Sequence, residues 1–158
     1  MKHTISVLVE NKFGVLASIA GLFSARGFNI DSLTVGRTED PTISEMTVVA
    51  EGDERILEQI AKQLYKLIDV IKVEDLTKAQ TDFIERELIL LRLRVSPAEE
   101  KKFQQVAKES EARVLKRNKD ILLVEIVNNQ DKIESALNLF KQFDIQRVFR
   151  TGKIAMKL

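Results

Sequence analysis

The sequence alternates between strand-like and helix-like periodicity, and the same order of segments occurs twice. In the first half, apolar residues recur at every second position in residues 4–9 and at three- and four-residue steps in residues 15–27. Strand-like segments follow at 30–37 and 43–50, then a helical one at 53–67 and a strand-like one at 70–76. This order, βαββαβ, is typical of a ferredoxin-like unit, in which two helices cover one face of a four-stranded antiparallel sheet.

The second half repeats the pattern without repeating the residues. Residues 77–83 are mainly polar and are expected to form a linker. A strand at 88–95 is followed by Ser96-Pro97-Ala98-Glu99, which has a capping-box serine, proline at the first helical position and glutamate three residues after the cap. Strands at 112–115 and 121–127, a helix at 133–140 and extended segments at 145–149 and 154–156 complete the order. We therefore predict an α+β chain with two consecutive ferredoxin-like βαββαβ units, at 1–76 and 84–158.

The composition limits the kinds of chemistry that this chain can perform and indicates its cellular compartment. None of the 158 residues is cysteine, which excludes disulfides, thiolate nucleophiles and cysteine metal sites. The sequence begins with alternating strand-like residues and shows neither an export signal nor a membrane span. We expect a cytoplasmic protein.

Charge is balanced over the chain but not between its halves. Residues 1–76 contain 8 Lys and Arg against 12 Asp and Glu, and the remainder contains 17 against 12, so the halves carry −4 and +5. The asymmetry suggests different partners for the two halves. Ordinary solvated surfaces are the preferred explanation, because net charge bears on association and not on fold, and the asymmetry is only a supporting clue.

No motif predicts catalysis. His3 is the only histidine, and no activated nucleophile accompanies it. The paired carboxylates Asp53-Glu54 and Glu99-Glu100 stand where helices begin, which the helix dipole favours. Phosphate-binding, dinucleotide-binding and metal-ligand spacings are absent from the sequence. We therefore expect no catalytic residue, no metal site and no cofactor in this chain.

Nucleic-acid binding is also not predicted. A ferredoxin-like sheet that binds RNA needs exposed aromatics on its central strands. The local basic cluster of Arg113, Lys116, Arg117 and Lys119 has no interleaved aromatic for base stacking. A solvated hairpin is the simpler interpretation.

Two loops that flank the first helix are candidates for a ligand site. The turn before the helix offers backbone N–H groups suited to a carboxylate, and a glycine that cannot obstruct a ligand. Asparagine amides can both donate and accept, which suits a zwitterion. The candidate residues are Asn11, Gly14, Val15, Leu16, Asn29 and Ile30. Asparagine and glycine are also common in loops without a ligand, so these residues alone leave both readings open.

The same segments resemble a known family. Residues 6–11 (Ser-Val-Leu-Val-Glu-Asn) and 29–35 (Asn-Ile-Asp-Ser-Leu-Thr-Val) look like an ACT domain, and more closely that of acetolactate synthase small subunits. The resemblance continues through Asp40-Pro41-Thr42, Gly52-Asp53-Glu54 and residues 57–67, and resumes at Glu85-Arg86-Glu87-Leu88 and Arg150-Thr151-Gly152. It is dense in the first half and sparse in the second. Phe13 departs from the family, in which proline is common at this place.

The resemblance implies a regulatory role. The partner in that family is a large catalytic subunit that carries thiamine diphosphate, magnesium and usually FAD. The small subunit raises its activity and confers feedback inhibition by a branched-chain amino acid, which we expect to be valine. The resemblance also implies pairing of ACT domains side by side in a homodimer or larger assembly, with the effector bound between neighbouring chains.

Two other functions are compatible with the fold. The first is a free-standing ACT-type amino-acid sensor that controls transcription or transport, although no helix-turn-helix is apparent in the sequence. The second is a small RNA-binding protein, which would show salt-sensitive affinity for RNA.

Overall fold

The chain forms two compact units. The structure is a computed structural model that describes residues 2–78 and 82–158. One unit comprises the chain up to Ile84 together with Lys153–Leu158, and the other comprises Glu85–Gly152.

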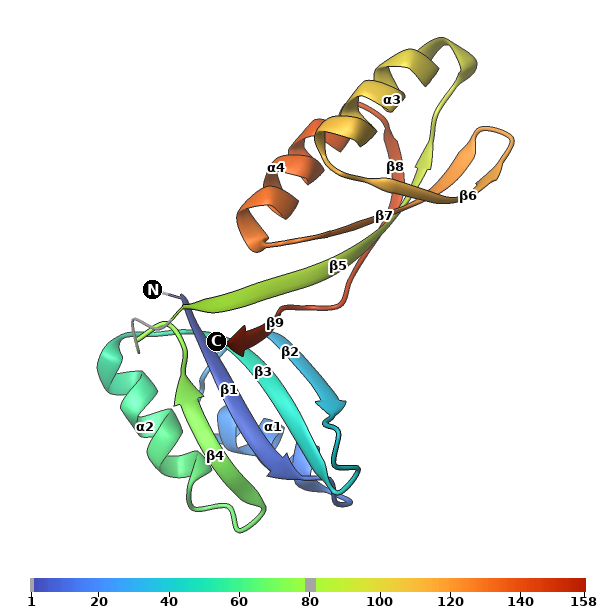
Figure 1. The fold of residues 1–158 in the computed structure, drawn as a ribbon. Coiled ribbons are helices and arrows are strands. Elements are labelled where there is room, and N and C mark those ends of the chain that lie inside the picture. The colour runs from blue at the N-terminus through green and yellow to red at the C-terminus, as the bar shows by residue number, and fades with distance from the viewer. Residues whose placement is uncertain (1, 79–81) are drawn as a thin grey trace. The chain divides into compact units, whose positions relative to one another are not determined.

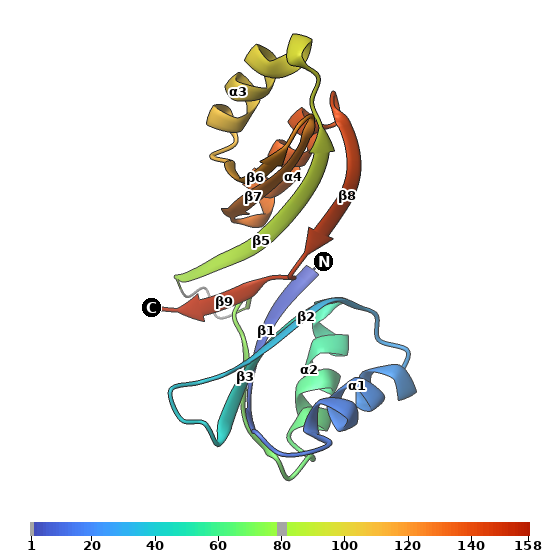
Figure 2. The same ribbon diagram turned by 90° about the vertical axis from the view of Figure 1, so that its right-hand side faces the viewer.

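The first unit has the predicted order of elements. They are β1 (Lys2–Glu10), α1 (Val15–Ala25), β2 (Ile30–Arg37), β3 (Ile43–Glu51), α2 (Glu54–Leu64) and β4 (Val70–Asp75). The strands form an antiparallel sheet in the order β2-β3-β1-β4, so β2 and β4 are its edges. Both helices cover the same face of this sheet (Figures 1 and 2).

The alternation along β1 explains this packing. Ile5, Val7 and Val9 are buried in the core with residues of both helices, among them Ile19 and Ile60. Successive side chains in a strand point to opposite faces, so this period of two places every second residue of β1 beneath the helices. The aspartate at position 53 caps α2, as predicted, by accepting a hydrogen bond from the Ile56 N–H at 2.9 Å.

The second unit repeats the topology. Its elements are β5 (Phe83–Arg94), the short 3₁₀ helix η1 (Pro97–Glu99), α3 (Glu100–Glu109), β6 (Arg113–Asn118), β7 (Ile121–Asn128), α4 (Gln130–Phe140) and β8 (Asp144–Arg150). The strand order β6-β7-β5-β8 corresponds to that of the first unit. Its core contains Phe103, Phe140 and Phe143, whose ring centroids lie 5.9 to 6.3 Å apart. The predicted fold class, two ferredoxin-like βαββαβ units, is confirmed.

The predicted capping motif closes the start of the first helix of the second unit. The backbone N–H and the hydroxyl of Ser96 donate hydrogen bonds to Glu99 Oε2, at 2.9 and 2.6 Å. The first turn is 3₁₀ and the α-helix begins at Glu100, a common arrangement at helix starts.

The C-terminal segment differs from the expected division at 84–158. The short strand β9 (Ile154–Lys157) follows β8, yet it clusters with the first unit. The Ala155 N–H donates to Thr47 Oγ1 of β3 at 3.3 Å, and the Leu158 N–H donates to the Asp82 carbonyl at 3.1 Å. The first unit is therefore built from two segments of the chain. The expected linker 77–83 falls partly on residues 79–81, which lie outside the described residues.

Candidate functional site

The turn between β1 and α1 is open at the start of the helix. Gly14 precedes α1 with φ of 84°, in the left-handed region, and no side chain caps the helix. A Cβ atom added at Gly14 would meet no heavy atom within 4 Å. Glycine is therefore needed here for its backbone conformation, while the space beside it is free.

The first turn of α1 presents backbone N–H groups to this space. The Val15 N–H makes a long bond of 3.4 Å to the Lys12 carbonyl, but Leu16 and Ala17 lie at helix positions whose N–H groups lack intrahelical acceptors. The Val15 side chain is buried in the core, so only its backbone faces the turn. The Leu16 side chain is 44% exposed. An anionic group fits this end of the helix, because the N–H groups and the helix dipole favour negative charge.

Asn11 is held in place by the hairpin between β2 and β3. Its backbone N–H donates to the Thr42 carbonyl at 2.7 Å, and its side-chain Nδ2 donates to the Pro41 carbonyl at 2.9 Å. Asp40 orders this hairpin by accepting hydrogen bonds from the N–H and hydroxyl of Thr42. The bond from the Thr42 hydroxyl lowers the pKa of Asp40. Asn11 is thus fixed, with one amide hydrogen engaged and Oδ1 left to accept from a ligand.

The two side chains that follow Asn11 behave differently. The Lys12 ammonium forms an ion pair with Glu10 and lies 3.8 Å from Asp69, and the hydrogen bond to Glu10 raises the pKa of Lys12. Its charge is therefore already engaged. Phe13 is fully exposed. The sequence did not predict an exposed aromatic ring beside the candidate site.

Asn29 and Ile30 lie at the opposite end of the unit from Asn11. Glu10 is in register with Ile43, near the start of β3, whereas Ile30 is in register with Ala50, near its end. Seven residues of extended chain separate these positions by roughly 20 Å. The structure therefore does not bring the two predicted halves of the site together within one chain.

Arg37 ends β2 at the same end of the sheet as Asn11, which sequence reasoning did not predict. Arg37 is exposed and is in register with Ser44, on the same end of the sheet as Asn11. No local sequence signal marks Arg37, because its place at this end of the sheet depends on the β2–β3 register.

The buried histidine does not form a usable catalytic pair. His3 Nδ1 lies 3.3 Å from Asp75 Oδ2, a distance that qualifies as an ion pair only if the ring is protonated. Neither ring nitrogen has a hydrogen-bond partner in the described part of the chain, so the angles do not support a hydrogen bond. The His3 residue is 1% exposed. A substrate has no access to this ring.

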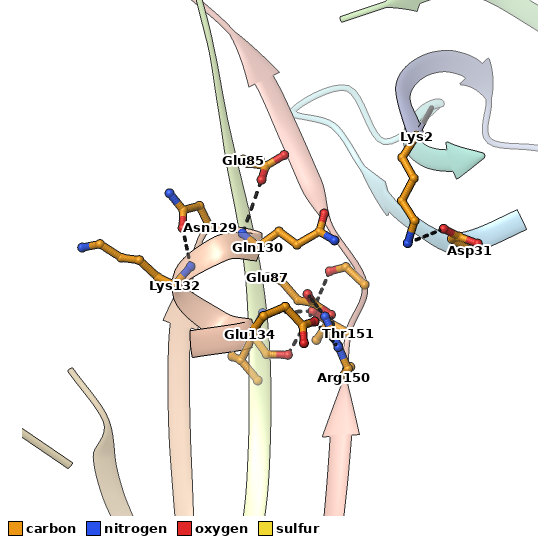
Figure 3. Close-up of polar contacts among 12 residues, drawn as sticks. Lys2, Asp31, Glu85, Glu87, Asn129, Gln130, Lys132, Glu134, Arg150 and Thr151 are labelled. Carbon is orange, nitrogen blue, oxygen red and sulfur yellow. Dashed lines mark hydrogen bonds and ion pairs between the residues drawn. The ribbon is translucent and has the colours of Figure 1, made fainter. Parts of the chain in front are cut away.

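The second unit contains a carboxylate cluster that is satisfied by its own chain (Figure 3). Arg150 donates from Nε and Nη2 to the two oxygens of Glu87, both at 2.8 Å, and from Nη1 to Glu134 at 2.9 Å. Glu87 is 7% exposed. The hydrogen bond to Glu87 raises the pKa of Arg150, which stays charged. Such a bidentate pair holds β5 and β8 together and offers no free acid or base.

Among residues 2–78 and 82–158, no group of three or more histidine and carboxylate side chains is placed to hold a metal ion. Within the same residues, no helix is long and apolar enough to cross a membrane.

Comparisons with known protein families match both halves of the chain. Residues 5–72 match the family described as "AHAS small subunit-like ACT domain". Residues 86–158 match the family described as "Small subunit of acetolactate synthase".

Individual relatives match over nearly the whole length. The chain is 46% identical over 156 residues to a probable acetolactate synthase small subunit of Archaeoglobus fulgidus, covering 99% of this chain and 96% of the relative. It is 36% identical over 157 residues to the acetolactate synthase isozyme 3 small subunit of Salmonella typhimurium, covering 99% and 95%. The crystal structure of the acetolactate synthase small subunit from Thermotoga maritima superposes with a TM-score of 0.92 at 34% identity, covering 100% of this chain and 98% of that one.

Proposed function

This chain belongs to the family of acetolactate synthase small subunits, and we propose that it regulates a catalytic acetolactate synthase subunit in response to a branched-chain amino acid. In this proposal the chain binds the large subunit and raises its activity. Valine bound to the first unit then lowers that activity by feedback. The chain itself is not the catalyst, and we place it in the cytoplasm.

The observation that carries the proposal is the match of both halves to the same kind of protein over almost the full length of each relative. A shared ACT domain alone would leave a free-standing sensor equally possible. The second half favours a regulatory subunit over a free-standing sensor, because residues 86–158 match the family of acetolactate synthase small subunits. Thiamine diphosphate, magnesium and FAD belong in this proposal to the large subunit alone.

The effector site is proposed to form between two copies of the chain. Within one chain the loop at Asn11 and the segment at Asn29 lie at opposite ends of the sheet. Antiparallel pairing of β2 with β2 of a second copy reverses one sheet relative to the other. It therefore places Asn29 and Ile30 of the second copy at the Arg37 end of the first copy, the end that holds Asn11 and Gly14.

Pairing through β2 would also satisfy the unpaired backbone groups at this edge of the sheet. An edge strand exposes backbone N–H and C=O groups that invite pairing with another chain. β2 is an edge of the first sheet. A homodimer joined at β2 covers this edge in both copies and completes two effector sites by one symmetry operation.

The chemical groups around each proposed site suggest how the three parts of an amino-acid effector would be bound. The effector carboxylate lies at the open start of α1, near the N–H groups of Leu16 and Ala17. The effector ammonium group can donate to Asn11 Oδ1 and to the Asn29 amide of the second copy. An aliphatic effector side chain then packs against exposed apolar groups, of which Leu16 and Phe13 are available.

The proposal is tested by reconstitution with the catalytic large subunit of acetolactate synthase from the same organism. We expect the chain to raise the rate of the large subunit and expect valine to lower it. Calorimetric titration with valine, leucine and isoleucine measures effector preference, and sedimentation equilibrium measures whether the chain is a dimer. A chain that binds none of the three amino acids and leaves the rate of the large subunit unchanged contradicts the proposal.

A further inference from the structure

The sheet of the second unit has one face that its own helices do not cover. Ile89, Leu91 and Leu93 of β5 are fully buried against α3 and α4. The intervening residues of β5 therefore point to the other side, and so do their partners in register on neighbouring strands. We call this side the open face. Figure 2 shows α3 and α4 together on the opposite side of the sheet.

The centre of the open face is mainly apolar. Leu90 is in register with Phe149 on β8, and Leu88 with Val127 on β7. Phe149 is 56% exposed and Val127 is 47% exposed. Together these residues form an apolar patch on adjacent strands, with no element of the second unit over it. Such patches on a soluble domain mark surfaces that bind other molecules.

A row of cations crosses the open face beside this patch. Arg92 is in register with Arg147 on β8 and with Leu123 on β7, and Leu123 is in register with Lys116 on β6. Arg92, Arg147 and Lys116 are exposed, and none forms an ion pair with a described residue. Like charges directly opposite on neighbouring strands destabilise a sheet. Folding of this unit alone therefore gives no reason for Arg92 and Arg147 to face each other.

The open face also holds the whole charge excess of the second unit. Residues 85–152 contain 14 Lys and Arg and 11 Asp and Glu, a net charge of +3. By the alternation along β5 and the register of its neighbours, the open face holds six of those cations and two of those carboxylates, which leaves eight cations and nine carboxylates elsewhere. The six are Arg86, Arg92, Arg94, Arg113, Lys116 and Arg147, and the two are Glu125 and Asp144. The rest of the unit therefore carries no positive excess.

We propose that the open face of the second unit docks an acidic protein surface whose carboxylates enter between Arg92 and Arg147 while an apolar centre covers Leu90 and Phe149. This inference rests on the proposed function, in which the occupant is the catalytic large subunit. Carboxylates from the partner relieve the repulsion between the two arginines, and the apolar patch supplies apolar contact area. The docking half and the effector-binding half of the chain are then different units.

Two other occupants fit the face less well. Single-stranded RNA is recognised by aromatic side chains on central strands. The residues on the open face of the central strands β5 and β7 include no aromatic, and Phe149 lies on the edge strand β8. A second copy of the same face would bring two surfaces of the same net positive charge together, because a two-fold contact uses the same surface of both copies.

The test is a paired charge reversal, Arg92→Glu with Arg147→Glu, made in the full-length chain. The two positions remain like-charged, so the cost to the sheet itself is retained while the sign presented to a partner is reversed. The matched control is Lys101→Glu with Lys102→Glu, which changes net charge equally at two exposed positions of α3 on the other side of the sheet. Affinity for the large subunit is measured at low and high salt. Calorimetric valine binding and circular dichroism of the same preparations show whether each variant is folded.

We expect the open-face variant to bind the large subunit at least about tenfold more weakly than the parent at low salt, with a smaller salt dependence, and to bind valine as the parent does. The control should stay within about twofold of the parent, because α3 is outside the docking surface. An open-face variant that is folded and binds the large subunit as tightly as the parent overturns the proposal. The proposal is also overturned if the open-face variant loses RNA binding or self-association while its affinity for the large subunit is unchanged. If the parent chain itself neither binds nor activates the large subunit, the proposed function fails, a result separate from failure of this face.

Discussion

The turn after the first strand differs between the two units, although both have the same strand order. In the first unit, Gly14 leads into α1 with no capping side chain, and the start of the helix is open. In the second, a capping box closes the start of the helix: the Glu99 carboxylate accepts hydrogen bonds from the N–H and hydroxyl of Ser96. One topology thus provides one helix start without a side-chain cap and one that is capped by the chain itself. This difference supports the proposal that the effector binds to the first unit.

The largest expected effect on stability tests whether the two units have independent hydrophobic cores. Phe23 and Phe140 are each fully buried, one in the core of each unit. We expect Phe140→Ala to lower the free energy of unfolding of the second unit by about 3–5 kcal/mol, and Phe23→Ala to act similarly on the first. Denaturant titration followed by circular dichroism and by valine binding should show two transitions, each moved by only one substitution. A single transition moved by both would contradict independent cores.

The ion pair of the second unit gives the next largest effect. Arg150→Leu leaves the nearly buried Glu87 without its bidentate partner. We expect a loss of about 2 kcal/mol, less than for a fully buried pair, because the Arg150 side chain is 38% exposed.

A matched control for Arg150 is available in the same unit. Arg117 also contacts both oxygens of a glutamate, Glu100, but at a more exposed site. Arg117→Leu should cost about 0–1 kcal/mol in the same denaturant titration. Equal losses for the two variants would show that burial of Glu87 does not matter.

Substitution of Gly14 tests whether the open turn binds the effector. Asp and Asn both tolerate the left-handed backbone better than other side chains and are similar in size, so Gly14→Asn controls for bulk and for roughly 1 kcal/mol of strain. Gly14→Asp adds a negative charge where the effector carboxylate is proposed to lie. We expect Gly14→Asp to bind valine at least about tenfold more weakly than Gly14→Asn by calorimetry. If the two folded variants bind valine equally, the carboxylate does not lie at this turn.

The smallest expected effect on stability comes from the capping box at Ser96 and depends on pH. Hydrogen bonds from the Ser96 hydroxyl and N–H lower the pKa of Glu99 below its ordinary value of 4.5. A carboxyl whose pKa is lower in the folded state contributes stability above its unfolded pKa and loses it as pH falls through the folded pKa. Glu99→Gln should therefore be less stable than the parent at neutral pH, and the difference in Tm should shrink on acidification below about pH 4. A difference independent of pH would contradict this role of the carboxylate. Valine affinity should not change in this variant.

Much of the fold could be predicted because its signals are local. The period-two alternation of Ile5, Val7 and Val9 and the cap at Asp53 involve residues at most four positions apart. The capping motif at Ser96 is equally local, and it forms as predicted. The candidate site was predicted less completely. The open start of α1 follows from Gly14, and the helical spacing of Val15 and Ile19 already indicates that the Val15 side chain faces the core. No local signal shows that Asn29 lies at the other end of the sheet from Asn11.

The sequence by itself determined the order of the elements, the starts of the first three helices and the family, because each depends on short-range periodicity or on a motif of a few residues. Only the tertiary structure decided three long-range features. Asn11 and Asn29 lie at opposite ends of one sheet, Glu87 meets Arg150 across 63 residues, and the last strand returns to the first unit at Thr47. Each of these depends on which strands pair and in which register. That choice is made by burial of a whole sheet face at once, and no segment of the sequence carries it alone.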